Sequence, residues 1–192
     1  MMKHRFEGIM EAIMERMDLY QALPIIVKMA VRRTCQVLEI EQPKIRISNE
    51  FTPNGGCYIH EYNELHIGRS FAGLSHYFEF ERMMEIICHE LRHKFQYDTG
   101  MFSPDDEYIT PEQGYEAYRS QPIEADAFEF GEYMSSVLAE VMLQSLEKIY
   151  GYVEQEEEIR PRKRGQQESE QNMEDYEDEM SSYYALEDSY EF

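Results

Sequence analysis

The chain has 192 residues and a formal net charge of −21 at pH 7. This length suits one ordinary domain, and 42% apolar residues are enough for a buried core. So acidic a protein repels nucleic-acid phosphates and anionic membrane surfaces, which excludes both as expected partners. The sequence has no apolar run of about 18 residues, and its three cysteines lie far apart. Because charges recur throughout its first 17 residues, we expect that this segment is not a secretory signal. We therefore expect a cytoplasmic protein with reduced thiols.

The N-terminal part of the sequence predicts two helices. Apolar side chains recur every three or four residues over 3–21, as they do in an amphipathic helix. Pro24 suits the first turn of a second helix that reaches about Glu39.

A small sheet is predicted next. The segment KIRIS (44–48) alternates like a half-buried strand. Residues 56–68 predict a hairpin in which Cys57–His60 pairs with Glu64–Ile67.

Two long helices are predicted to follow the sheet. The first runs from about Ser75 to Asp98, with Gly100 near its C-terminal cap. A loop-rich connection covers 99–120, and Pro122 begins the last helix, which reaches about Tyr150. The expected fold is α+β, with one compact domain over 1–153.

The end of the chain differs in composition. Residues 154–192 contain 14 acidic and 4 basic residues and few aliphatic ones. Repeated like charges and little apolar surface cannot offset the entropy of ordering, so we predict a disordered acidic tail.

The segment HELRH (89–93) carries the clearest chemical signal, because its two histidines are separated by one helical turn. On a helical wheel, both lie opposite an apolar stripe that would pack on the core. This stripe consists of Phe80, Met84, Ile87, Leu91 and Phe95. The imidazoles of His89 and His93 can then reach one metal ion.

A zinc site needs at least three protein ligands. A third histidine six residues after His93 is excluded, because position 99 is Thr. Glu124, in the first turn of the last helix, is the candidate, and the small residues Ala125, Ala127 and Gly131 permit close helix approach. The other interpretation is that Glu124 only favours the helix N-terminus electrostatically.

Together, HELRH and PIEADAF (122–128) resemble the gluzincins, zinc metallopeptidases of the minimal-gluzincin and ImmA/IrrE-like types. The resemblance implies a zincin-like fold in which His89, His93 and Glu124 bind Zn²⁺ and Glu90 is the general base. It implies peptide-bond hydrolysis with a peptide or protein as substrate. Candidate donors to the reacting carbonyl oxygen are Tyr115, Tyr118 and His76, and strand 64–68 is expected to pair with the substrate by its edge.

Two alternatives to the peptidase hypothesis remain. The same three ligands can brace a non-catalytic module that binds a partner through the acidic tail. A separate structural zinc site can also be built from Cys57, His60 and His66, although a second cysteine at suitable spacing is missing.

Overall fold

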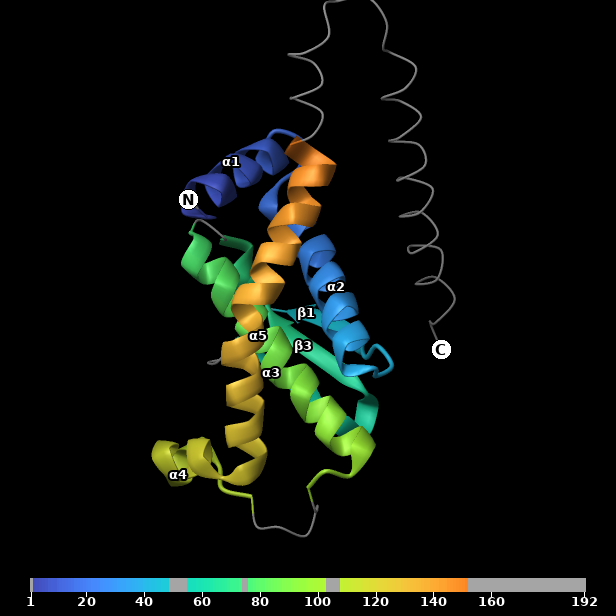
Figure 1. Ribbon diagram of the computed structural model, residues 1–192, viewed down its shortest axis with the longest axis vertical. Coiled ribbons are helices and arrows are strands. Elements are labelled where there is room, and N and C mark those ends of the chain that lie inside the picture. Colours follow the sequence, from blue (N-terminus) through green and yellow to red (C-terminus); the bar gives the residue numbers. More distant parts are fainter. Residues whose placement is uncertain (1, 49–54, 74–75, 103–107, 152–192) are drawn as a thin grey trace, which may run out of the picture. The chain divides into compact units, whose positions relative to one another are not determined.

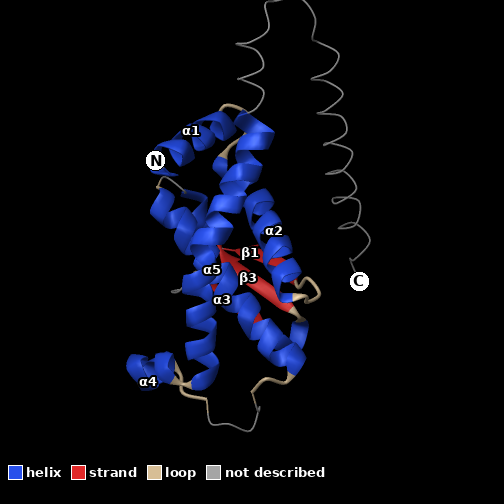
Figure 2. Ribbon diagram, viewed as in Figure 1, coloured by secondary structure: helices blue, strands red, loops and turns tan. Residues whose placement is uncertain are grey.

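The computed structural model of the chain describes residues 2–48, 55–73, 76–102 and 108–151. By its internal contacts the chain divides into Met1–Tyr150 and Gly151–Phe192. The first unit is mostly helical with one small sheet, which confirms the predicted α+β class (Figure 1, Figure 2). The tail predicted for 154–192 lies outside the described residues.

The two N-terminal helices meet at a different place from the one predicted. Helix α1 spans Met2–Met14, and α2 spans Leu19–Leu38. Asp18 and Gln21 form a capping box, each side chain accepting a hydrogen bond from the other's backbone N–H. The single helix predicted over 3–21 is therefore wrong. Pro24 lies in the second turn of α2 rather than in its first.

The sheet contains the predicted strand and hairpin. Strands β1 (Lys44–Ser48), β2 (Gly56–Ile59) and β3 (Glu64–Gly68) are arranged in the order β1-β3-β2. Strand β3 pairs in parallel with β1 and antiparallel with β2, and a 3-10 turn (His60–Tyr62) closes the hairpin. Because β3 has a partner on both sides, it has no free edge. The predicted edge pairing of a peptide with 64–68 is therefore wrong. A 3-10 segment, Arg69–Gly73, follows the sheet.

Helix α3 (Tyr77–Thr99) is the centre of the fold and packs on α5, on α2 and on strands β2 and β3 (Figure 1). It ends at Gly100, whose φ of 64° is the left-handed cap predicted there. The predicted apolar stripe is fully buried at Phe80 and Leu91 and partly buried at Phe95. The opposite side of α3 is also covered, because α5 packs over it.

The connection after α3 is more ordered than predicted. Its described part contains a 3-10 turn, Pro111–Gln113, and a short helix α4, Tyr115–Ser120. A capping box between Thr110 and Gln113 starts this segment. Helix α5 begins at Pro122 as predicted but ends at Leu146, where a π-helical turn, Glu147–Gly151, continues the chain.

One hydrophobic core joins α1, α2, β3, α3 and α5. Cys88, on α3, belongs to it and is fully buried, and this burial raises the pKa of its thiol to about 12. Among the described helices, none is both long and apolar enough to cross a membrane.

Candidate metal centre

His89 and His93 lie one turn apart on the side of α3 that faces α5. Their Nε2 atoms are 3.1 Å apart, and the two rings are perpendicular. Both side chains are nearly buried, with 11% and 13% of their surface exposed. The two imidazole rings therefore point into the interface between α3 and α5. This is the side of α3 opposite the apolar stripe, as the helical wheel predicts.

Glu124 faces both rings from the first turn of α5. Its Oε1 lies 3.3 Å from Nε2 of His93, and its Oε2 lies 3.4 Å from Nε2 of His89. The ligand atoms of the three residues all lie within 4.8 Å of one another. In the described part of the chain, no other trio of His, Cys, Asp or Glu gathers in this way. The predicted convergence of the three side chains is confirmed.

Small residues on α5 allow this approach. Gly131 lies against α3, where a Cβ atom would stand 3.2 Å from the carbonyl oxygen of Glu85 and 3.4 Å from Cβ of His89. Ala127 is completely buried at the same interface. Ala125 is exposed and takes no part, so the prediction for this residue is wrong.

The donor set fits a divalent cation. Glu124 is 1% exposed, and its Oε2 has no hydrogen-bond partner within the described structure. Burial by itself raises the pKa of Glu124, but the two imidazoles overcome this effect and hold the pKa below its ordinary value. An ionised, buried carboxylate needs positive charge beside it. A cation bound by two imidazole nitrogens and one carboxylate oxygen would satisfy this need.

A second layer of hydrogen bonds holds His93. Its Nδ1 lies 2.8 Å from Oε1 of Gln96. The Nε2 of Gln96 donates to the carbonyl oxygen of Ile123 and to Oδ2 of Asp126, and Arg92 forms a bidentate ion pair with Asp126. Asp126 therefore lies behind the three converging side chains rather than among them. The role of Gln96 was missed, because a lone glutamine carries no motif.

Glu90, the predicted general base, follows His89 on α3 and points toward β2. Its Oε2 accepts a hydrogen bond of 2.8 Å from the backbone N–H of Tyr58. Burial raises the pKa of Glu90, against the lowering effect of His89 and His93. The carboxyl group is therefore held beside the imidazoles without being one of the three converging ligands.

Tyrosines from the connection before α5 surround Glu124. The hydroxyl of Tyr108 donates a 2.7 Å hydrogen bond to Glu124 Oε1. Burial, followed by hydrogen bonding to Glu124, raises the pKa of Tyr118. Of the predicted donors, Tyr118 is thus at the site and Tyr115 is exposed beyond it, with ring centroids 6.2 Å apart. No sequence signal distinguished Tyr108.

The third predicted donor lies elsewhere on α3. His76 is the N-cap of the helix, 13 residues before His89. At 1.5 Å per residue, this separation is about 20 Å along the helix axis. His76 therefore cannot act on a group bound between His89 and His93.

The alternative zinc site on the hairpin does not assemble. Cys57 and His66 are paired across β2 and β3, but His60 stacks on the ring of Tyr97 with centroids 4.3 Å apart. The Nε2 of His66 lies 3.0 Å from a carboxylate oxygen of Glu64. The three proposed ligands therefore face different neighbours.

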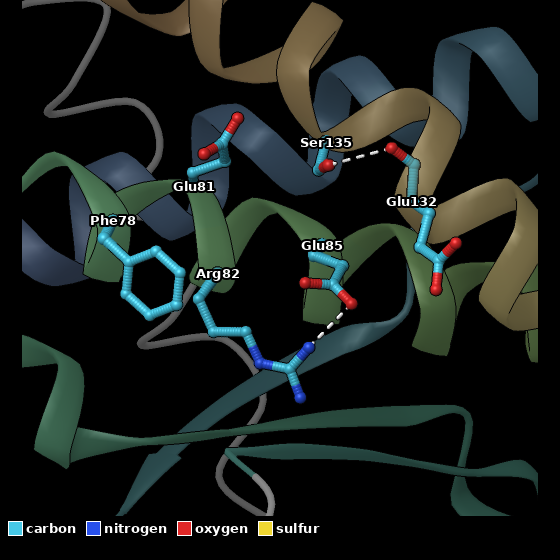
Figure 3. A pocket seen from close by; sticks show the side chains of 6 residues that line it. All are labelled: Phe78, Glu81, Arg82, Glu85, Glu132 and Ser135. Carbon is cyan, nitrogen blue, oxygen red and sulfur yellow. Dashed lines mark hydrogen bonds and ion pairs between the residues drawn. The ribbon is translucent and has the colours of Figure 1, made fainter.

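A hollow of about 170 Å³ lies between α3 and α5, beyond Gly131. Figure 3 shows that Arg82 points toward Glu85, with which it forms an ion pair of 2.6 Å. Ser135 donates to the carbonyl oxygen of Glu132. The hollow thus contains an internal ion pair, and no trio of candidate metal ligands forms among its described residues.

No protein-family model matches the chain, and no curated protein or solved structure shows significant similarity to it.

Proposed function

We propose that this chain is a zinc-dependent peptidase of the gluzincin type. The proposal rests on one observation: the imidazoles of His89 and His93 and the buried carboxylate of Glu124 converge from two helices, with Glu90 held beside them. The HELRH and PIEADAF segments, which resemble gluzincin motifs, supply these four residues.

Zinc is the metal that suits this donor set best. Two neutral imidazoles and one carboxylate, with no thiolate among them, are a common ligand set of catalytic zinc sites. Calcium and magnesium prefer oxygen ligands alone. Three protein ligands also leave a coordination position open, which catalytic zinc sites require and structural sites lack.

A zinc ion held by these ligands would act as a Lewis acid and lower the pKa of water. Glu90 would accept a proton from the attacking water and pass it to the leaving amine. Its hydrogen bond from Tyr58 N–H orients the carboxylate for this role. The raised pKa of Glu90 makes it a better proton acceptor than a solvent-exposed carboxylate.

The hydroxyls of Tyr108 and Tyr118 are the donors best placed to stabilise negative charge on the reacting carbonyl oxygen. Both groups lie at Glu124 and come from the same connection between α3 and α5. Tyr108 is anchored there because Ile109 exchanges two backbone hydrogen bonds with the side chain of Gln121, at the start of α5.

The alternative function is a non-catalytic module in which zinc braces the α3–α5 contact. The burial of His89 and Glu124 in a helix interface, with His93 only partly exposed there, favours it. The two functions differ in what they require of Glu90, which is beside the ligands but not one of them.

The test uses the full chain with three substitutions. Glu124→Ala should remove bound zinc, because the site keeps only two ligands. Glu90→Gln should retain zinc and lower hydrolysis of a peptide library by at least about 100-fold. Glu129→Gln, at an exposed position on α5, is the matched control and should change neither property.

The outcomes separate the two functions. Zinc bound by the unmodified chain without cleavage of any peptide would reject the peptidase and leave the braced module. Zinc content unchanged by Glu124→Ala would reject both functions, since each depends on the same three ligands.

A further inference from the structure

Gln96 lies directly behind the metal centre and is 1% exposed. Its side-chain amide makes three short contacts, at 2.8 Å to Nδ1 of His93, 2.9 Å to the carbonyl oxygen of Ile123 and 2.7 Å to Oδ2 of Asp126. A single amide group thus links a ring on α3 to the backbone next to Glu124 on α5.

The chemistry of the partners fixes which way this amide points. A backbone carbonyl only accepts hydrogen bonds, and so does an ionised carboxylate. Asp126 is ionised, because both of its carboxylate oxygens form an ion pair with the Arg92 guanidinium, at 2.8 and 3.0 Å. The NH₂ group of Gln96 must therefore face Ile123 and Asp126. A reversed amide would set its oxygen against two acceptors, and the buried NH₂ group against the ring.

We infer that Gln96 is a positioning residue that holds neutral His93 as the Nδ1–H tautomer, so that the Nε2 lone pair faces Glu124 and the metal. With its oxygen turned to the ring, Gln96 accepts a hydrogen bond and therefore requires the proton on Nδ1 of His93. This inference rests on the proposed function, because a fixed Nε2 lone pair is useful only where a metal binds. Its geometry does not depend on a bound ion.

The tautomer of His89 is set by different contacts. No hydrogen-bond partner for Nδ1 of His89 occurs among the described residues. Its Nε2 lies 3.1 Å from Nε2 of His93, which offers a lone pair. In the metal-free protein, His89 should therefore carry its proton on Nε2 and donate to His93. The two neutral rings then adopt opposite tautomers, and metal binding moves the proton of His89 alone, from Nε2 to Nδ1.

The direct test is long-range ¹H–¹⁵N spectroscopy of the histidine rings in the full, metal-free chain, at a pH where both rings are neutral. The expected result is Nδ1–H for His93 and Nε2–H for His89, with only His89 changing after zinc is added. A proton on Nε2 of His93, or an equal mixture of tautomers there, would overturn the inference.

A variant tests whether Gln96 is the cause. Gln96→Met keeps the length of the side chain but removes the acceptor, so His93 should lose its single tautomer. Zinc affinity, measured by chelator competition, should fall about 10- to 100-fold. An unchanged tautomer and affinity in this variant would contradict the role of Gln96. If Gln96→Met does not fold, the tautomer of His93 in the unmodified chain still decides the inference, and Nε2–H there would reject it.

The matched control is Gln36→Met. This exposed amide on α2 accepts a hydrogen bond from Arg33 and touches neither ring. It should leave both tautomers unchanged. The tests also distinguish this inference from the proposed function. A chain that shows the expected tautomers but binds no zinc would reject the function alone, and a zinc-binding chain with Nε2–H on His93 would reject the inference alone.

Discussion

The carboxylate of Glu124 and the ring of His93 share one buried space, so the charge of each depends on the other. Burial lowers the pKa of His93, but Glu124 and Glu90 overcome this effect and raise it above its ordinary value. The pKa of Glu124 is lowered, so this residue stays ionised wherever the protein is folded near neutral pH. In the metal-free protein at pH values below the raised pKa of His93, a second proton on this ring therefore occupies the place of the cation.

The first prediction concerns the pH dependence of zinc affinity. Because the pKa of His93 is raised, its proton competes with zinc at pH values above about 6.5. Apparent zinc affinity should fall as pH decreases through this raised pKa, by up to tenfold per pH unit, and level off above it. The same proton stabilises the metal-free fold. That contribution should be present below about pH 6.5 and be lost as pH rises through the raised pKa.

Chelator competition at constant ionic strength over a pH series measures this dependence. His60→Gln, on the exposed hairpin turn, is the control and should leave the profile unchanged. An affinity that does not vary between about pH 6 and pH 8 would show that His93 binds no proton in this range.

Sequence reasoning found the residues whose relation is local. His89 and His93 are neighbours on any helix. Pro122 marks the start of α5, which places Glu124 in the first turn of that helix. Tyr108 and Gln96 could not be found in this way, because their contacts arise only when α5 packs on α3. Glutamine and tyrosine are also common in other roles, so neither has a spacing that marks it.

At the scale of the elements, the crossing of α3 and α5 sets the distance between the ligands. The two helices touch at Gly131, which lies against Glu85 and His89 of α3 and two turns along α5 from Glu124. The separation of the helix axes at this crossing therefore determines how closely the carboxylate approaches the rings.

The second prediction is that Gly131→Ala weakens zinc binding more than it weakens the fold. An alanine gains up to about 1 kcal/mol of helix propensity, which offsets part of the cost of contact. Its Cβ would meet the Glu85 carbonyl at 3.2 Å, so the helices must separate by a few tenths of an ångström. Zinc affinity should fall roughly tenfold, since coordination tolerates little displacement.

The control for this prediction is Gly8→Ala on α1. A Cβ there meets nothing within 4 Å, so the change should only stabilise the fold, by roughly 0.5–1 kcal/mol. Urea unfolding and chelator competition measure the two effects. A Gly131→Ala chain with unchanged zinc affinity would show that α5 can shift without moving Glu124.

The elements predicted well are those with strong local signals. The alternation of KIRIS, the hairpin, and the start of α5 at Pro122 all follow from periodicity or from proline. The boundary between α1 and α2 was misplaced because apolar spacing continues across it. The Asp18–Gln21 capping box, whose residues can be read in the sequence, starts α2 and so separates it from α1. Helix α4 was missed because six residues are too few for a periodic pattern.

In the domain as a whole, ion pairs connect the N-terminal helix α1 to the last helix, α5. Arg5 of α1 donates to Glu140 of α5 at 2.8 Å and to Glu147, just beyond α5, at 3.0 Å. Its side chain is 27% exposed, so the ion pairs are partly shielded from solvent. Ends of the domain that are distant in sequence thus stabilise each other.

The third prediction is that Arg5→Met lowers the free energy of unfolding by roughly 1 kcal/mol, a value reduced for partial exposure. Urea unfolding of the metal-free protein measures this free energy. Lys3→Met is the matched control. Lys3 is mostly exposed and forms one long ion pair of 3.9 Å with Glu7, so the change should be close to zero. Equal effects of the two substitutions would show that Arg5 does not fasten α1 to α5.

The thiol of Cys88 adjoins His89 in sequence, yet it lies in the apolar core on another side of α3. Its raised pKa keeps it protonated at neutral pH, and a protonated, inaccessible thiol reacts slowly with peroxide or alkylating reagents. The converging side chains of His89, His93 and Glu124 offer nitrogen and oxygen atoms, which mild oxidants leave intact. A zinc site built from them should therefore survive oxidative stress that disables thiolate-bound zinc sites.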